Sequence, residues 1–185
     1  MRKRYTLQDI KLLMNREIFV DANVFIYLFG DTSNRDVESQ YASLFSHLNK
    51  QGNKFIIDFI VISEIVNRLF HFAYLNYLAS YNKIEKKAFR NTSKGKESLK
   101  EIYIRTNDVI LTKFTVIGKA FDQNDIVNFL IEDGLDFNDK AIVKICQENS
   151  FVLLTNDSDF KNSSVEILTT NVKLLNRYHN ERKHD

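Results

Sequence analysis

The chain has 185 residues, of which 44% are hydrophobic and 27% are charged. This length and composition suit one folded globular domain and exclude a disordered or fibrous chain. Its 26 Lys and Arg against 24 Asp and Glu exclude a uniformly basic nucleic-acid-binding chain. A single cysteine excludes an internal disulfide and a multi-cysteine zinc site. No apolar run reaches signal-peptide or membrane-span length, so we expect a cytoplasmic protein.

The near-neutral total conceals two blocks of opposite charge. Residues 68–119 contain eleven basic and four acidic side chains, whereas residues 120–160 contain two basic and nine acidic ones. Such blocks can be solvated helical faces. They can also be a basic strip beside an acidic site, an arrangement suited to an anionic polymer whose reacting phosphate meets metal ions.

The first half of the chain alternates helical and extended patterns. Thr6 and Asp9 have the spacing of a capping box at the start of a short helix over 6–15. Further apolar periodicities predict strands and helices over 18–20, 24–29, 36–50 and 55–57. Ser63 is the predicted N-cap of a long helix, which the polar stretch 91–96 separates from another long helix over 97–112.

The second half continues this alternation, with elements predicted over 114–117, 123–132, 139–149, 151–155 and 165–168. Strands that alternate with helices favour a parallel sheet, and continuous apolar runs such as 151–154 are typical of strands covered on both faces. The sequence therefore predicts an α/β protein, a three-layer α/β/α sandwich with a mainly parallel central sheet.

Four acidic residues lie at special places in this pattern. Asp21 and Asp157 follow predicted strands, and Glu64 and Asp139 lie at the starts of predicted helices. In a parallel sheet these places share one edge, where ligands bind. Helix capping explains any single one of them. Together they would repel one another unless cations lay between them, and carboxylate oxygens favour Mg²⁺ or Mn²⁺.

The residues around these acids carry a family resemblance over roughly 17–80 and 120–170. In order and spacing they resemble the PIN-domain ribonucleases, especially the VapC-like toxins of type II toxin–antitoxin pairs. The matching positions are Asp21 with Asn23, Ser63 with Glu64, Asp139 with Ala141, and Thr155 with Asp157, Asp159 and Phe160.

The resemblance implies a PIN-like fold and an Mg²⁺- or Mn²⁺-dependent endoribonuclease that leaves a 5′-phosphate and a 3′-hydroxyl. It implies that Asp21, Glu64, Asp139 and Asp157 are the catalytic metal ligands. Asn23, Ser63 and Thr155 are expected to support them through hydrogen bonds. We interpret Asp159 as a loop cap rather than a fifth metal ligand. A homodimer and an antitoxin protein are the implied partners, besides the RNA substrate.

Two departures from compact members of the family define the expected domain organisation. A segment of about seventeen residues precedes the first predicted strand, and the interval between Glu64 and Asp139 is long. We therefore expect one PIN-like domain over 1–185, with an N-terminal extension over 1–16 and a basic helical insertion around 81–118. The insertion contains the candidate RNA-binding residues Lys83, Lys86, Lys87, Arg90, Lys94, Lys96 and Lys100.

Other functions stay open at this point. The chain could be a stand-alone PIN nuclease in RNA processing. It could also be a PIN-fold module that acts mainly through protein–protein contacts, because Phe70, Tyr74, Tyr77 and Tyr81 recur at helical spacing. A strand-end aspartate also resembles the nucleophile of haloacid-dehalogenase-like phosphatases, but Asn23 stands where those enzymes need a second aspartate.

Overall fold

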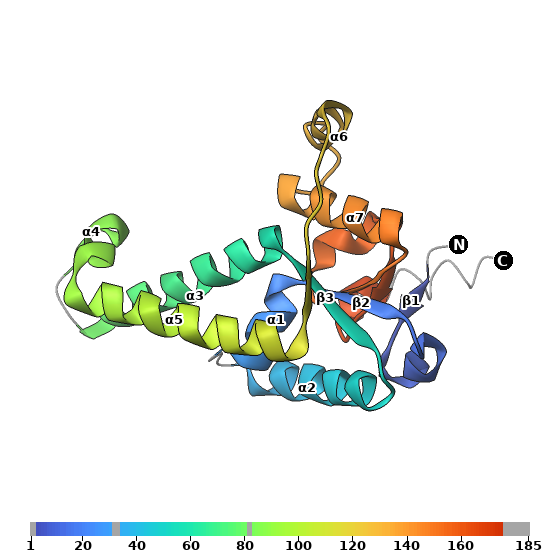
Figure 1. Cartoon of the computed structure of the whole chain (residues 1–185), viewed down its shortest axis with the longest axis horizontal. Coiled ribbons are helices and arrows are strands. Elements are labelled where there is room, and N and C mark those ends of the chain that lie inside the picture. The colour runs from blue at the N-terminus through green and yellow to red at the C-terminus, as the bar shows by residue number, and fades with distance from the viewer. Residues whose placement is uncertain (1–2, 31–33, 81–82, 176–185) are drawn as a thin grey trace.

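The computed structural model describes residues 3–30, 34–80 and 83–175 (Figure 1). In this part of the chain, six strands form one sheet in the order β1-β6-β5-β2-β3-β4. Every pairing between neighbouring strands is parallel. The strands are β1 (Arg4–Tyr5), β2 (Glu17–Val20), β3 (Lys54–Asp58), β4 (Thr115–Ile117), β5 (Val152–Leu154) and β6 (Glu166–Leu168).

Helices join these strands, as parallel pairing requires. The α-helices are α1 (Ala22–Phe29), α2 (Arg35–Lys50), α3 (Phe59–Ser80), α4 (Lys86–Asn91), α5 (Ser93–Lys113), α6 (Gln123–Phe129) and α7 (Phe137–Asn149). Two 3₁₀ helices, η1 (Leu7–Leu13) and η2 (Ser158–Asn162), complete the described elements. Among these helices, none combines the length and apolar character needed to span a membrane.

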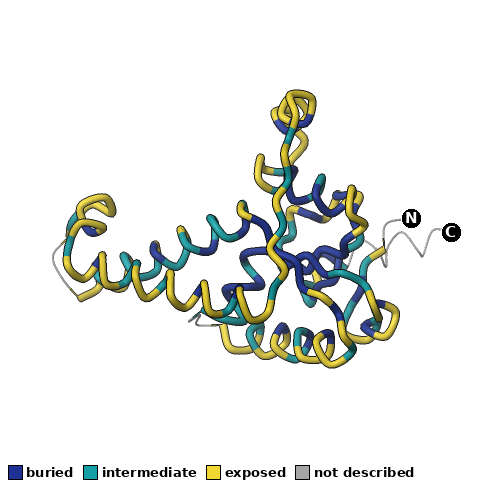
Figure 2. The backbone as a smooth tube through the Cα atoms, viewed as in Figure 1, coloured by how far each residue is buried: buried dark blue, intermediate teal, exposed yellow. Residues whose placement is uncertain are grey.

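Alternate side chains of the strands enter two separate hydrophobic clusters. Phe19, Leu153 and Ile167 join the first cluster, which α7 and the start of α3 cover. The intervening strand positions, such as Ile18 and Val152, join the second cluster, which α2 and η1 cover. The central strands are accordingly the most buried part of the chain (Figure 2). The expected three-layer α/β/α sandwich is confirmed, and its sheet is wholly parallel.

The N-terminal segment, expected as an extension, contributes to this sheet. Its strand β1 pairs with β6 at the edge of the sheet. The guanidinium of Arg4 donates hydrogen bonds to the backbone carbonyls of Val165 and Ser163. Thr6 and Asp9 form the predicted capping box of the short helix η1. A two-residue strand carries too weak a periodicity to be predicted from sequence.

Helix boundaries were predicted less well than helix positions. Ser63 is not an N-cap, because α3 begins at Phe59, directly after β3, and the backbone N–H of Val61 donates to the Asp58 side chain instead. The polar stretch 91–96 does not separate two helices, because Thr92 caps α5 and the helix begins at Ser93. Helix α4 and the 3₁₀ helix η2 were not predicted.

Helices α3 and α5 lie side by side and form an arm that runs away from the sheet, with α4 at its outer end (Figure 1). Phe89 of α4 is fully buried there and packs against the rings of Phe70, Tyr74 and Tyr77. The predicted aromatic stripe of α3 therefore packs within the arm. Tyr81 and the rest of 81–82, with which the expected insertion begins, lie outside the described residues.

The corner between α4 and α5 depends on a close backbone approach at Gly95. A Cβ atom added there would lie 2.0 Å from the carbonyl oxygen of Phe89, which is backbone and cannot swing aside. We expect Gly95→Ala to lower the free energy of unfolding by about 1–3 kcal/mol, measured by urea unfolding. Gly118→Ala is the control, because no atom lies within 4 Å of its added Cβ. Equal stability of the two variants would contradict this account.

Candidate active site

The four predicted acids come from four segments that meet at the C-terminal edge of the sheet. Asp21 follows β2 and is the N-cap residue of α1, and Asp157 follows β5 as the N-cap of η2. Asp139 lies in the first turn of α7. Glu64 lies farther into its helix than predicted, because α3 begins five residues before it. Parallel strands end together, which brings these segments to one place.

Asp21 is buried at this edge of the sheet, and a hydrogen bond fixes its side chain. Its side chain is buried, with a relative exposure of 5% for the residue. The hydroxyl of Thr155 donates to Asp21 Oδ2 at 2.6 Å and accepts a hydrogen bond from the backbone N–H of Asp157 at 2.9 Å. One threonine thus fixes both the first acid and the loop that carries another. The expected supporting role of Thr155 agrees with these contacts.

The loop after β5 is tied down on its other side by α1 and α2. The backbone N–H of Asn156 donates to the side-chain oxygen of Asn23 at 3.1 Å. The buried hydroxyl of Tyr41 lies 3.0 Å from both the carbonyl oxygen of Thr155 and the side-chain oxygen of Asn156. Sequence reasoning placed Tyr41 on a helix face but missed this hydroxyl, because helical spacing does not reveal what a tyrosine oxygen contacts.

The four acids are close enough to interact electrostatically. Burial, followed by the negative charges of Asp136, Asp21, Asp157 and Glu64, raises the pKa of Asp139 to about 8. Burial, with smaller contributions from the charges of Glu64 and Asp157 and against the hydrogen bond from Thr155, raises the pKa of Asp21 to about 6. All four carboxylates therefore lie within electrostatic range, where like charges favour protonation.

Three of the four carboxylates nevertheless form hydrogen bonds or ion pairs with protein groups around them. Besides Asp21 with Thr155, Glu64 is paired with Arg68 at 3.2 Å, and Asp157 accepts the backbone N–H of Asp159 at 2.9 Å. Across residues 3–30, 34–80 and 83–175, no three Asp, Glu, His or Cys side chains are grouped as they would be around a metal ion. Side-chain rotation would be needed before several of these oxygens could coordinate one cation.

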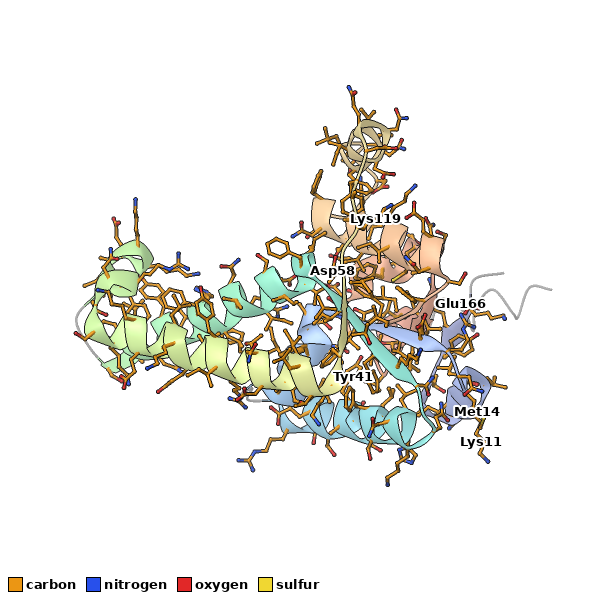
Figure 3. All side chains as sticks on the ribbon, in the orientation of Figure 1. Lys11, Met14, Tyr41, Asp58, Lys119 and Glu166 are labelled. Atoms are coloured by element: carbon orange, nitrogen blue, oxygen red, sulfur yellow. The ribbon has the colours of Figure 1, made fainter. Side chains whose placement is uncertain are left out.

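Asp58 is a carboxylate at this edge that sequence reasoning missed. It is buried at the junction of β3 and α3 (Figure 3), and its side chain accepts the backbone N–H of Val61 at 2.9 Å. It therefore performs the capping role predicted for Ser63, which is half-buried inside α3. Burial, followed by the charges of Asp58 and Asp21, raises the pKa of the Cys146 thiol. Cys146 is thus a protonated core residue.

The remaining predicted site residues fall in two places. Asp159 is exposed in the first turn of η2, and the residue that caps this turn is Asp157, so our interpretation of Asp159 as the cap was wrong. The candidate RNA-binding residues are all exposed. They precede α4 or lie on α4 and the first half of α5, at the outer end of the arm: Lys83, Lys86, Lys87, Arg90, Lys94, Lys96 and Lys100.

The basic cluster and the acids are therefore not side by side. Sixteen residues of α3 separate Glu64 from Ser80 at the outer end of the arm. At the helical rise of about 1.5 Å per residue, this separation is about 25 Å. The charge pattern left open both a solvated helical face and a basic strip beside an acidic site, and the arm places the candidate RNA-binding residues away from the acids, whereas Arg68 of the same basic block pairs with Glu64.

Comparison with known proteins gives one family match and two structural likenesses. The PIN domain family matches residues 18–165. A chain of the VapBC2 structure from Rickettsia felis, bound to a DNA fragment from their promoter, is 17% identical, with a TM-score of 0.47 over 83% of this chain and 98% of that chain. PAE2754 from Pyrobaculum aerophilum is 18% identical, with a TM-score of 0.48 over 90% of this chain and 92% of that one. No curated protein matches the chain.

The raised pKa values make the stability of the metal-free chain dependent on pH. Between about pH 4 and pH 8 the folded chain binds more protons at Asp139 than the unfolded chain, whose carboxyl has a pKa of 3.8. The free energy of unfolding should therefore fall as pH rises through this window. Asp139→Asn should raise it by about 2 kcal/mol at pH 8 and hardly change it at pH 4.

Urea unfolding in EDTA across this pH range measures the effect. The matched control is Asp108→Asn, which removes an exposed carboxylate from α5, far along the chain from the site. This control should keep the pH slope of the wild type. If Asp139→Asn keeps that slope as well, the pKa of Asp139 is not raised as described.

Proposed function

Because this chain belongs to the PIN domain family, we propose that it is a metal-dependent endoribonuclease, the toxin of a toxin–antitoxin pair. The observation that carries the proposal is the convergence of four carboxylates at one edge of the sheet, where burial first and the charges of neighbouring acids second raise the pKa of Asp139 and Asp21. Such crowding disfavours the empty, fully ionised site and favours a bound divalent cation.

The donor chemistry of the site fits Mg²⁺ or Mn²⁺. Carboxylates are hard oxygen ligands, and these two metals favour them over imidazole or thiolate. Asp21, Glu64, Asp139 and Asp157 are the residues we propose to hold the cation. When bound, such an ion supplies a water of lowered pKa and offsets the charge of the attacked phosphate. The arrangement of Asp21 on a buried, hydrogen-bonded frame makes it the most firmly positioned of the four.

The residues around the proposed metal ligands would hold those ligands in place and would not take part in the reaction themselves. Thr155 orients Asp21 and the start of the Asp157 loop through its hydroxyl, and Asn23 holds the backbone of Asn156. Tyr41 fixes the same loop from the α2 side. Ser63 remains an expected support, although the cap role expected of it belongs to Asp58. Such fixed neighbours lower the cost of ordering ligands when a cation binds.

Asp21→Asn tests the catalytic proposal directly. The amide removes one negative charge from the most rigid ligand but keeps its shape, so Mg²⁺-dependent cleavage of a labelled single-stranded RNA should fall by about 100-fold or more. Asp139→Asn should act in the same way. Asp108→Asn is the control, expected to cleave like the wild type. Retained cleavage in both Asp21→Asn and Asp139→Asn would contradict the assignment.

We also propose the outer end of the arm as an RNA contact. Its exposed lysines can neutralise phosphates, which is the main source of sequence-independent affinity for nucleic acid. An RNA that contacts both the outermost lysines of this cluster and the acids must span about 25 Å. At about 3.4 Å per nucleotide along a stacked strand, that is on the order of seven nucleotides. The arm would therefore favour long RNAs over short ones.

A variant with Lys86, Lys87 and Lys96 all changed to Ala tests this contact. Binding of an RNA of about 30 nucleotides should weaken, and the slope of log affinity against log salt should shrink by about 2, measured by fluorescence anisotropy. Cleavage of an oligonucleotide of about five nucleotides should not change, because it cannot reach the outer end of the arm.

The control replaces three exposed lysines elsewhere, Lys11, Lys50 and Lys54, with Ala. It removes the same charge from η1, the end of α2 and the start of β3. If this control flattens the salt slope as much as the arm variant does, net charge rather than a specific contact explains the binding.

Antitoxin binding and homodimer formation are part of the same proposal. They are supported by an apolar cavity of about 620 Å³ between α3 and α5, lined by residues that include Ile62, Val66 and Ile110. Tyr103 and Ile104, which also line it, are about half exposed. Exposed apolar surface of this kind is typical of protein contacts. A stand-alone nuclease would have the same acids, so the partner must be sought by co-purification.

A further inference from the structure

One basic side chain, Arg68, contacts an acid of the proposed site, Glu64. It lies one helical turn after Glu64 on α3, and its Nη1 atom donates to Glu64 Oε1 at 3.2 Å. Both side chains are partly open to solvent, with exposures of 43% and 33%. Arg68 is therefore in contact with Glu64 and open to an incoming ligand.

The partner of Arg68 is one of two carboxylates, with Asp157 the other, whose charges act on both remaining acids of the site. The charge of Glu64 acts on both Asp21 and Asp139. The charged groups with the largest effects on those two acids are all carboxylates. A cation held against Glu64 therefore offsets part of the repulsion in the metal-free site, and a divalent ion must compete with it for the same oxygens.

We propose that Arg68 is a positioning residue with two successive partners: it holds Glu64 in the metal-free site, and it contacts an RNA phosphate after Glu64 is released. The inference rests on the proposed nuclease function. The planar guanidinium suits both partners, because it pairs with carboxylate and phosphate in the same two-pronged geometry. Lysine can replace its charge but not that geometry.

A purely structural role makes different predictions. Glu followed by a basic residue four positions later is a common helix-stabilising pair of small effect, particularly when both side chains are partly exposed. Arg68→Ala should thus fold normally, with a melting temperature within about 2 °C of the wild type. This makes the variant suitable for binding measurements. A structural pair alone would leave the affinities for metal and RNA unchanged.

Calorimetric titration of the metal-free protein with Mn²⁺ tests the first partner. Arg68→Ala should bind Mn²⁺ about three- to tenfold more tightly than the wild type, because a competing positive charge is gone. Arg68→Lys should stay within about twofold of the wild type. Lys54→Ala is the matched control, since it removes a cation paired with Glu17 at the opposite edge of the sheet. It should not change the Mn²⁺ affinity.

Steady-state cleavage of a labelled single-stranded RNA at saturating Mn²⁺ tests the second partner. Arg68→Ala should raise KM about three- to tenfold and leave kcat within about twofold, because a phosphate contact that is the same in ground and transition states affects binding alone. Arg68→Lys should restore part of the loss in KM. A merely structural residue would not separate KM from kcat in this way.

The outcomes distinguish this inference from the proposed function. A wild-type chain that binds no Mn²⁺ or cleaves no RNA overturns the nuclease proposal, and the role of Arg68 with it. If the wild type binds and cleaves but Arg68→Ala has the same Mn²⁺ affinity, only the competition with Glu64 is overturned. If Arg68→Ala binds Mn²⁺ more tightly at an unchanged KM, only the phosphate contact is overturned.

Discussion

The structure depends on one constraint: like charges are crowded at the edge where parallel strands end. Because β2, β3 and β5 run in the same direction, the segments that follow them meet, and acids far apart in sequence come within electrostatic range. Three polar contacts stabilise the ionised form of these carboxylates. Thr155 donates to Asp21, Arg68 pairs with Glu64, and a backbone amide donates to Asp157. These contacts are the ones a bound cation would supplement or displace.

The rest of the fold separates this crowded edge from the lysines at the outer end of the arm. The first cluster of core residues anchors the start of α3 beneath the acids, while an aromatic cluster around Phe89 holds the outer end of the arm. A helix of 22 residues joins the two clusters. Its length keeps the basic surface of the outer end at a distance from the acids, so the two do not neutralise each other.

Much of this architecture could be predicted from sequence, for reasons that differ between elements. The central strands are short apolar runs and α2 has a clear helical periodicity, so their positions were predicted closely. Helix starts were predicted poorly where the cap was unusual. Asp58 lies within a run that reads as a strand, and its capping of α3 becomes visible only when the N–H of Val61 is placed beside it. The strand β1 exists only because β6 offers it an edge.

The candidate site, like the fold, could be predicted only in part from the sequence. Sequence alone placed Asp21, Asp139 and Asp157 at strand ends and a helix start, because residue order and hydrophobic periodicity are local properties of the chain. It put Glu64 too near its helix start and missed Asp58. It also determined the two blocks of opposite charge. Only the tertiary structure decided that Tyr41 holds the Asp157 loop, and that the lysines lie at the outer end of an arm. Those facts depend on distances between segments, which the packing of helices on both faces of the sheet sets and local sequence does not encode.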